Sequence, residues 1–167
     1  MISKFYPTEY FTSTYHIPFE KYYEEGYRGI LFDVDNTLVP HGAIADDRAK
    51  ELFQRLHKIG FETCVVSNNG KMRVETFYKE SGVKHFIYKA RKPSKRGYLQ
   101  GMNKMGTTIE NTLFVGDQIF TDIYGANRLG LTSILVQPLH PKEEIQIVIK
   151  RYIERIILHW YNKRRGR

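Results

Sequence analysis

Short apolar runs and amphipathic segments alternate along the chain from Gly29 onward. The apolar runs are four to six residues long, which is typical of strands buried on both faces of a sheet. They are GILF (29–32), FETCVV (61–66), HFIY (85–88), TLFVG (112–116) and TSILV (132–136). The segments between them have apolar residues at helical spacing, and three of them end at a glycine, the usual residue just after a helix. We therefore predict helices over 46–59, 71–81, 93–105 and 119–129, with Pro93 in the first turn of the third.

This regular alternation indicates an α/β fold of the doubly wound, Rossmann-like type. We expect a mainly parallel, five-stranded sheet with right-handed crossovers and with helices on both faces. A chain of 167 residues is long enough for one hydrophobic core. We expect a single domain (1–167) made of an aromatic N-terminal arm (1–28), a core (29–138) and a basic C-terminal helix and tail (141–167).

Polar clusters follow four of the five predicted strands. Because sites in open α/β sheets form at the carboxyl ends of the strands, these clusters should meet at one edge of the sheet. The clusters contain Asp33, Asp35 and Thr37 after the first strand, Ser67 and Asn68 after the second, Lys92 after the third, and Asp117 and Asp122 after the fourth.

Four aspartates at one edge repel each other unless a cation lies between them. Carboxylate-rich ligation points to Mg²⁺, and no His or Cys cluster has the spacing of a zinc site. This set of groups suits phosphoryl transfer. It offers a carboxylate nucleophile, a second carboxylate as acid and base, a hydroxyl and a lysine. Each residue taken alone also has a plain structural interpretation: turn or helix-capping residues for Asp117, Asp122, Ser67 and Asn68, and a solvated surface lysine for Lys92.

The order of the clusters resembles the motifs of the haloacid-dehalogenase (HAD) superfamily of phosphohydrolases. FDVDNTL (32–38), VVSNN (65–69), RKP (91–93) and VGDQIFTDIYGAN (115–127) match its four motifs, and the resemblance covers 29–136. It implies that Asp33 attacks phosphorus to form an aspartyl-phosphate, and that Asp35 first protonates the leaving group and then activates water. It also implies a phosphate-binding set of Thr37, Ser67, Asn68 and Lys92, and a Mg²⁺ site of Asp33, the Asp35 carbonyl and Asp117, supported by Asp122.

The lengths of the segments between the motifs indicate which subclass of the superfamily the chain resembles. One helix and one strand fill the chain from Asp33 to Ser67, and the same is true from Ser67 to Lys92, which leaves no room for an inserted cap domain. This resembles the capless subclass III-A, whose open sites suit bulky substrates. The N-terminal arm, DNT in place of the commoner DGT and the basic C-terminal helix resemble the YqeG-type branch, which is similar to the phosphatidylglycerophosphate phosphatases of mitochondria and chloroplasts.

The charge of the chain limits the class of partner. The formal net charge is +8, which favours phosphates, nucleic acid or an acidic lipid surface. From Pro141 onward there are eight basic residues against three acidic ones, so this segment supplies +5. We expect a phosphorylated substrate, with phosphatidylglycerophosphate or another anionic phospholipid leading. A nucleotide or nucleic-acid-end phosphatase and a phosphate-sensing assembly module without catalysis are the alternatives.

The single cysteine, Cys64, excludes an intramolecular disulfide and favours a reducing, cytoplasmic setting. We find neither an apolar stretch of membrane-spanning length nor a signal-peptide core, and we expect a cytoplasmic protein that can lie at the inner face of the membrane.

The two ends of the chain each allow two interpretations. The arm holds nine aromatic residues, which either pack on the flank of the sheet or face a lipid interface. The segment 143–160 has an apolar stripe that either covers the sheet or lies on an anionic membrane beside its basic residues. The stripe consists of Ile145, Val148, Ile149, Tyr152, Ile156 and Trp160.

Overall fold

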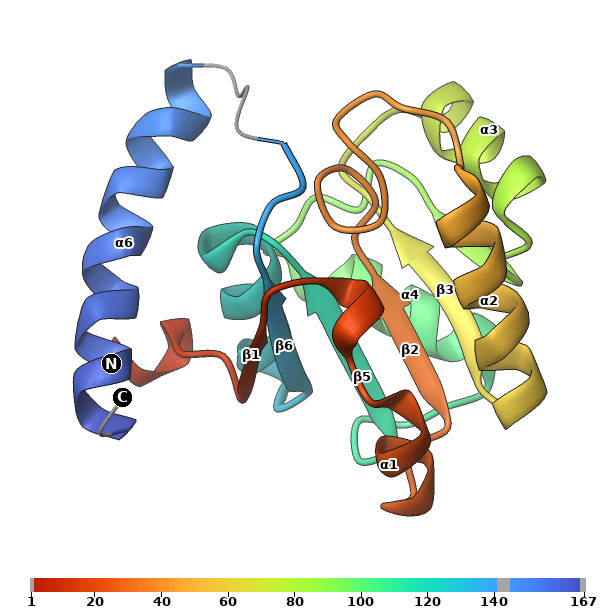
Figure 1. The fold of residues 1–167 in the computed structure, drawn as a ribbon, viewed down its shortest axis with the longest axis horizontal. Coiled ribbons are helices and arrows are strands. Elements are labelled where there is room, and N and C mark those ends of the chain that lie inside the picture. The colour runs from red at the N-terminus through yellow and green to blue at the C-terminus, as the bar shows by residue number, and fades with distance from the viewer. Residues whose placement is uncertain (1, 141–144, 166–167) are drawn as a thin grey trace.

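The computed structural model describes residues 2–140 and 145–165 (Figure 1). Six strands form one sheet in the order β1-β6-β5-β2-β3-β4, and every neighbouring pair is parallel. The strands are β1 (Glu9–Phe11), β2 (Gly29–Phe32), β3 (Glu62–Val66), β4 (His85–Ile87), β5 (Thr112–Gly116) and β6 (Thr132–Val136). β2 lies in the middle of the sheet, and all four of its residues are buried.

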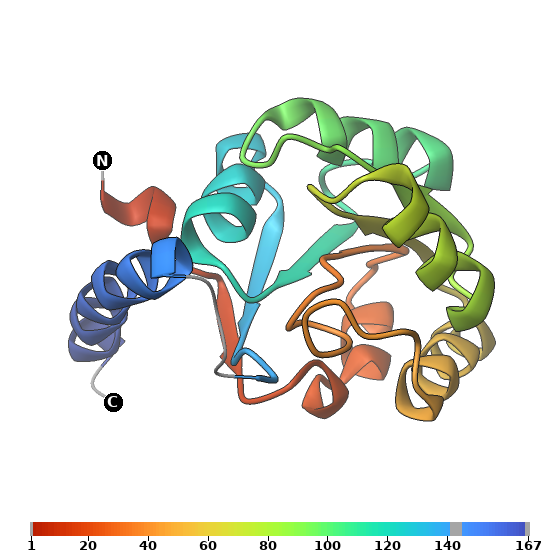
Figure 2. The ribbon, with the colours of Figure 1, turned by 90° about the horizontal axis from the view of Figure 1, so that it is seen from above.

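Helices cover both faces of the sheet, as Figure 2 shows. On one face α1 (Phe19–Glu24), α2 (Asp47–Ile59) and α3 (Lys71–Ser81) bury Phe19, Phe53 and Phe77 in a cluster with residues of β2, β3 and β5. On the other face α4 (Lys95–Met105) and α5 (Tyr124–Leu129) pack around Tyr98 and Phe114. The remaining elements are the 3₁₀ turns η1 (Ile2–Phe5) and η2 (Thr14–His16), the π-helical turn η3 (Ile119–Ile123), and α6 (Ile145–Arg165).

The fold class agrees with the prediction, but the sheet has six strands and not five. The extra strand, β1, comes from the N-terminal arm and pairs with β6 in the register Glu9↔Ile134. Its three residues are all half-buried, so they lack the alternation by which a strand is recognised in a sequence.

Two helix starts differ from the predicted ones. α4 begins at Lys95, with Ser94 as its N-cap, so Pro93 precedes the helix and does not lie in its first turn. The segment predicted as one helix over 119–129 begins with the π-helical turn η3 and becomes α-helical only at Tyr124.

The aromatic residues of the N-terminal arm pack on the core, and all nine of them are buried or half-buried. Phe19 and Tyr22 are buried, while Phe5 stacks on Tyr124 with ring centroids 4.5 Å apart. The arm therefore follows the packing interpretation and not the lipid-facing one.

Helix α6 lies beyond the edge strand β1, at one side of the sheet (Figure 1). The side that faces the body includes Glu154 and Tyr161, which are 5% and 7% exposed. Tyr152, Ile156 and Trp160 are 68%, 48% and 56% exposed, so the expectation that these three residues cover the sheet is wrong. Residues 141–144, where the predicted helix began, and the tail residues 166–167 lie outside the described part of the chain. Among the described residues, no helix is both long and apolar enough to cross a membrane.

Candidate active site

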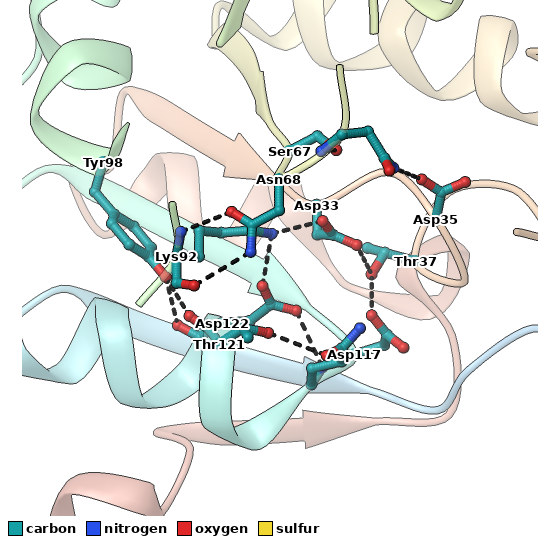
Figure 3. Close-up of polar contacts among 12 residues, drawn as sticks. Asp33, Asp35, Thr37, Ser67, Asn68, Lys92, Tyr98, Asp117, Thr121 and Asp122 are labelled. Atoms are coloured by element: carbon teal, nitrogen blue, oxygen red, sulfur yellow. Dashed lines mark hydrogen bonds and ion pairs between the residues drawn. The ribbon is translucent and has the colours of Figure 1, made fainter. Parts of the chain in front are cut away.

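The carboxyl ends of β2, β3, β4 and β5 bring the four polar clusters to one edge of the sheet (Figure 3). Because these strands are parallel and neighbours, the residue that follows each of them reaches the same edge. Asp33 follows β2, Ser67 follows β3 and Asp117 follows β5, while Lys92 lies in the loop after β4.

Three of the four predicted aspartates form a compact cluster. Carboxylate oxygens of Asp33, Asp117 and Asp122 all lie within 4.8 Å of one another, and the three residues are 7%, 2% and 1% exposed. The backbone N–H of Gln118 donates to Asp122 Oδ2 at 3.0 Å, which fixes this carboxylate against the turn after β5. A Cβ atom on Gly116 would lie 2.5 Å from that same oxygen, so the close approach requires glycine.

Lys92 reaches into this cluster from the loop after β4. Its Nζ donates to Asp33 Oδ1 at 2.6 Å and to Asp122 Oδ1 at 2.7 Å, and the residue is 7% exposed. Burial alone lowers the pKa of Lys92, but the charges of Asp122 and Asp33 outweigh it, so the pKa lies above its usual value. The lysine is therefore a charged, buried partner of the site and not a solvated surface residue.

Burial also raises the pKa values of two of the acids. The pKa of Asp33 is raised to about 6 by burial, although Lys92 opposes the shift. Burial and the neighbouring charges of Asp33 and Asp122 raise the pKa of Asp117 well above its usual value. Against these three buried carboxylates, Lys92 and the Arg151 guanidinium, which binds Asp117, supply two positive charges.

Asp35 lies apart from this cluster. One of its oxygens accepts from the Gly42 N–H at 2.7 Å and from an Arg73 nitrogen at 2.8 Å, and the other accepts from Asn69 Nδ2 at 2.5 Å. The bonds from Asn69 and Arg73 join the loop after β2 to the loop after β3 and to helix α3. The Asp35 carboxylate is thus held by these three donors and does not belong to the cluster of the other three acids.

Thr37 connects two acids, and Asn68 positions the lysine. Thr37 Oγ1 donates to Asp117 Oδ1 at 3.2 Å and to Asp33 Oδ2 at 3.5 Å. Asn68 Oδ1 accepts from the Lys92 N–H at 2.6 Å, while its Nδ2 donates to the Lys92 carbonyl at 3.2 Å. Ser67 is buried, and its hydroxyl accepts from the Asn69 N–H at 3.1 Å.

The sequence analysis missed several residues of the site. The Arg151 guanidinium, on α6, donates to the carboxylate and the carbonyl oxygen of Asp117. It also donates to Glu154 at 3.2 Å, and Glu154 in turn accepts from the Ile119 N–H at 2.8 Å. An Arg and a Glu three positions apart on a basic helix look like an exposed ion pair, so the sequence carried no signal for this contact. Arg73 and Tyr98 were also missed, and Asn69 lies in the VVSNN motif but was given no role. The Tyr98 hydroxyl donates to the Thr121 carbonyl at 2.6 Å.

The donor set suits a hard divalent cation. Asp33, Asp117 and Asp122 offer only oxygen atoms, which Mg²⁺ prefers, and Thr37 adds a hydroxyl beside two of them. The raised pKa values of Asp33 and Asp117 point the same way, because a bound cation would stabilise their ionised forms.

Comparison with known proteins decides the family. The model of the HAD-hydrolase-like family matches residues 89–138. The probable phosphatase YqeG of Bacillus subtilis is 37% identical over 95% of this chain and 92% of its own length. The chain belongs to the YqeG-type branch of the HAD-like hydrolases. As a member of this family of phosphatases, it is a hydrolase of phosphoric monoesters.

Two further comparisons give a more distant relative by sequence and a solved structure with the same fold. Phosphatidylglycerophosphate phosphatase 1 of Arabidopsis thaliana is 28% identical over 89% of this YqeG-type chain and 46% of its own length. The chain therefore spans about half the length of that plant relative. A solved structure from Listeria monocytogenes shares the fold with a TM-score of 0.56 at 19% identity, over 70% of this chain and 84% of the other.

Proposed function

We propose that this protein is a Mg²⁺-dependent phosphatase that acts through an aspartyl-phosphate on Asp33, with phosphatidylglycerophosphate as its substrate. The observation that carries the proposal is the contact of Lys92 with both Asp33 and Asp122, within the cluster of three carboxylates. This arrangement puts a nucleophile, a fixed positive charge and a set of cation ligands at one point.

Asp33 is the proposed nucleophile. Lys92 and Thr37 each donate toward one of its two oxygens, so the carboxylate has a fixed orientation before the substrate arrives. Attack by an Asp33 oxygen forms the bond to phosphorus as the bond to the leaving oxygen breaks. Lys92 and the Ser67 hydroxyl then lie where they can donate to phosphoryl oxygens. A bound Mg²⁺, held by Asp33, Asp117 and Asp122, would supply positive charge for the transferring phosphoryl group.

Asp35 is the proposed acid and base. It lies two residues after Asp33 and is 9% exposed. Arg73 and Asn69 bind its carboxylate and hold it apart from the three other acids. In the first step its proton goes to the leaving oxygen, and in the second step it takes a proton from the attacking water.

The substrate assignment has two supports. Relatives from Arabidopsis thaliana and Chlamydomonas reinhardtii, each 28% identical, are named as phosphatidylglycerophosphate phosphatases. In addition, the chain between Asp33 and Lys92 forms only α2, β3, α3, β4 and their loops, so it holds no cap domain that would exclude a lipid.

Access to a lipid would be helped by α6. Its exposed apolar residues Tyr152, Ile156 and Trp160 lie beside Arg155 and Lys163, which are exposed as well. This combination is typical of a helix that lies in the interface of an anionic membrane. We infer a cytoplasmic protein that binds the inner face of the membrane peripherally.

The experiment is phosphate release from an aryl phosphate by the full chain, with Mg²⁺ and with EDTA. We expect release with Mg²⁺ only, and its loss in Asp33→Asn and in Asp35→Asn. Wild-type rates in both variants would contradict the mechanism. Release from phosphatidylglycerophosphate vesicles, compared with a 5′-phosphorylated oligonucleotide, tests the substrate, and a preference for the oligonucleotide would favour the nucleic-acid alternative.

A further inference from the structure

A basic groove runs between the edge strand β4 and helix α4, and its lining includes Arg91, the residue before Lys92. The volume of this groove is about 740 Å³. The cavity under α6 has a volume of about 490 Å³. Five cationic residues line the groove, and the described part of the chain contributes no Asp or Glu to its lining. The five are Lys71, Lys89, Arg91, Arg96 and Lys104.

Most of these cations have no acidic partner. Several exposed basic residues elsewhere on the surface pair with carboxylates, as Arg55 does with Glu20 and Lys84 with Glu62. In the described part of the chain, the side chains of Lys71, Lys89, Arg91 and Arg96 form no such pair. Positive charges that line a concave site raise the local concentration of anions. The groove is therefore built to hold a negatively charged group.

The groove is continuous with the loop that carries the catalytic lysine. Arg91 immediately precedes Lys92, and the loop is fixed to the neighbouring motif by bonds from the Lys89 N–H to the Asn69 carbonyl (2.8 Å) and from the Ala90 N–H to the Ser67 carbonyl (3.0 Å). Lys89 and Arg91 have φ values of 46° and 55°, a left-handed conformation that such residues rarely adopt. Both line the groove, while Ala90 between them is buried.

We propose that this groove binds a second phosphate group of the substrate, while the first phosphate is hydrolysed at Asp33. The inference rests on the proposed function and specifies its substrate class: molecules that carry a phosphate monoester and, a few bonds away, a further phosphate such as a phosphodiester. Arginine and lysine suit such a group, because guanidinium binds phosphate oxygens in pairs and ammonium adds a point charge.

A nucleic-acid strand fits this groove less well. Single strands are bound by several aromatic platforms on which successive bases stack. The groove has two aromatic residues, Phe86 and Tyr88, and Phe86 is half-buried with its ring 4.7 Å from that of Tyr78. Only Tyr88, at 41% exposed, offers a free surface.

The test compares two substrates in solution: phenyl phosphate, with one phosphate, and dihexanoyl phosphatidylglycerophosphate below its micelle concentration, with two. The variant is Lys71→Gln/Arg96→Gln, because both side chains are exposed and neither makes a side-chain hydrogen bond within the described residues. The matched control is Lys58→Gln/Lys95→Gln, which removes two exposed helical lysines outside the groove. The readout is the ratio of kcat/KM for the two-phosphate substrate to kcat/KM for phenyl phosphate.

We expect this ratio to fall on the order of tenfold in the groove variant and to stay at the wild-type value in the control. A second arm measures calorimetric binding of the same lipid to Asp33→Asn, with and without the groove substitutions, so the groove is tested even if no turnover occurs. An equal ratio in both double variants, or lipid affinity that the groove substitutions leave unchanged, would overturn the inference. Loss of affinity for a 5′-phosphorylated oligonucleotide but not for the lipid would overturn it too. Absence of turnover in the wild type, with binding that depends on the groove, would reject the proposed function alone.

Discussion

The Arg151 guanidinium binds both the carboxylate and the carbonyl oxygen of Asp117. The arginine comes from α6, 34 positions further along the chain, and the Asp117 side chain that it contacts is fully buried. A cationic side chain thus occupies one oxygen of a carboxylate that we assign to the metal site. Arginine and Mg²⁺ should therefore compete for Asp117.

Replacing Arg151 tests this competition. In Arg151→Gln the positive charge is lost, and we expect Mg²⁺ to bind about fivefold more tightly, since a competing charged hydrogen bond is removed. Isothermal titration calorimetry with Mg²⁺ measures this directly. Arg155→Gln, an exposed arginine on the same helix, is the control. Weaker Mg²⁺ binding in Arg151→Gln would show instead that the arginine supports the site.

Lys92 should stabilise the protein most when no metal is bound. Lys92→Met keeps the length of the side chain but leaves Asp33 and Asp122 without their buried partner. We expect a loss of about 3 kcal/mol in the free energy of unfolding with EDTA, and a smaller loss with Mg²⁺. Urea unfolding under both conditions measures it, with the exposed Lys58→Met as control. Equal stability of Lys92→Met and wild type in EDTA would contradict the ion pairs.

His57 gives the fold a pH dependence away from the site. Burial lowers the pKa of its imidazole, which lies 2.9 Å from the Thr63 hydroxyl through Nε2. Because the folded pKa lies below the unfolded one, this group contributes stability above about pH 6.5, and the contribution is lost as the pH falls through the folded pKa. We expect a shallower decline in the free energy of unfolding over that interval for His57→Gln. NMR titration of the His57 ring checks the shift, and a pKa above its usual value would contradict the prediction.

The exposed face of α6 should bind anionic lipid. We expect Tyr152→Ser/Trp160→Ser to reduce binding to phosphatidylglycerol vesicles several-fold, because it removes apolar surface that would enter the interface. Leu99→Ser, at an exposed apolar residue on α4, is the control. Sedimentation with vesicles measures the bound fraction. Unchanged binding of the double variant would remove α6 from the membrane contact.

Much of the core could be predicted from the sequence, because buried parallel strands appear as unbroken apolar runs between amphipathic helices. GILF and TLFVG match β2 and β5 residue for residue. The short strand β1 could not be predicted, since its pairing with β6 depends on where the N-terminal arm packs and not on its own pattern. The same is true of α6: one of the two interpretations placed its apolar stripe on the sheet, but Glu154 faces the body, where it accepts from the Ile119 N–H and pairs with Arg151.

Part of the candidate active site could also be predicted from the sequence, and part could not. Strand order places Asp33 and Asp117 together, whereas Asp122 reaches them through the turn η3 and the close approach to Gly116. The bonds of Asp35 to Arg73 and Asn69 depend on how the loop after β2 meets the loop after β3 and the start of α3, for which the sequence has no periodic signal.

The most direct test of the central claim is chemical trapping of the intermediate on Asp33. The full chain is mixed with Mg²⁺ and dihexanoyl phosphatidylglycerophosphate, quenched within one turnover and reduced with borohydride, which converts an aspartyl-phosphate to homoserine. Peptide mass spectrometry then locates the change. The account predicts homoserine at position 33 only, and none after EDTA treatment. Turnover of the substrate with an unmodified Asp33, or homoserine at another aspartate, would contradict it.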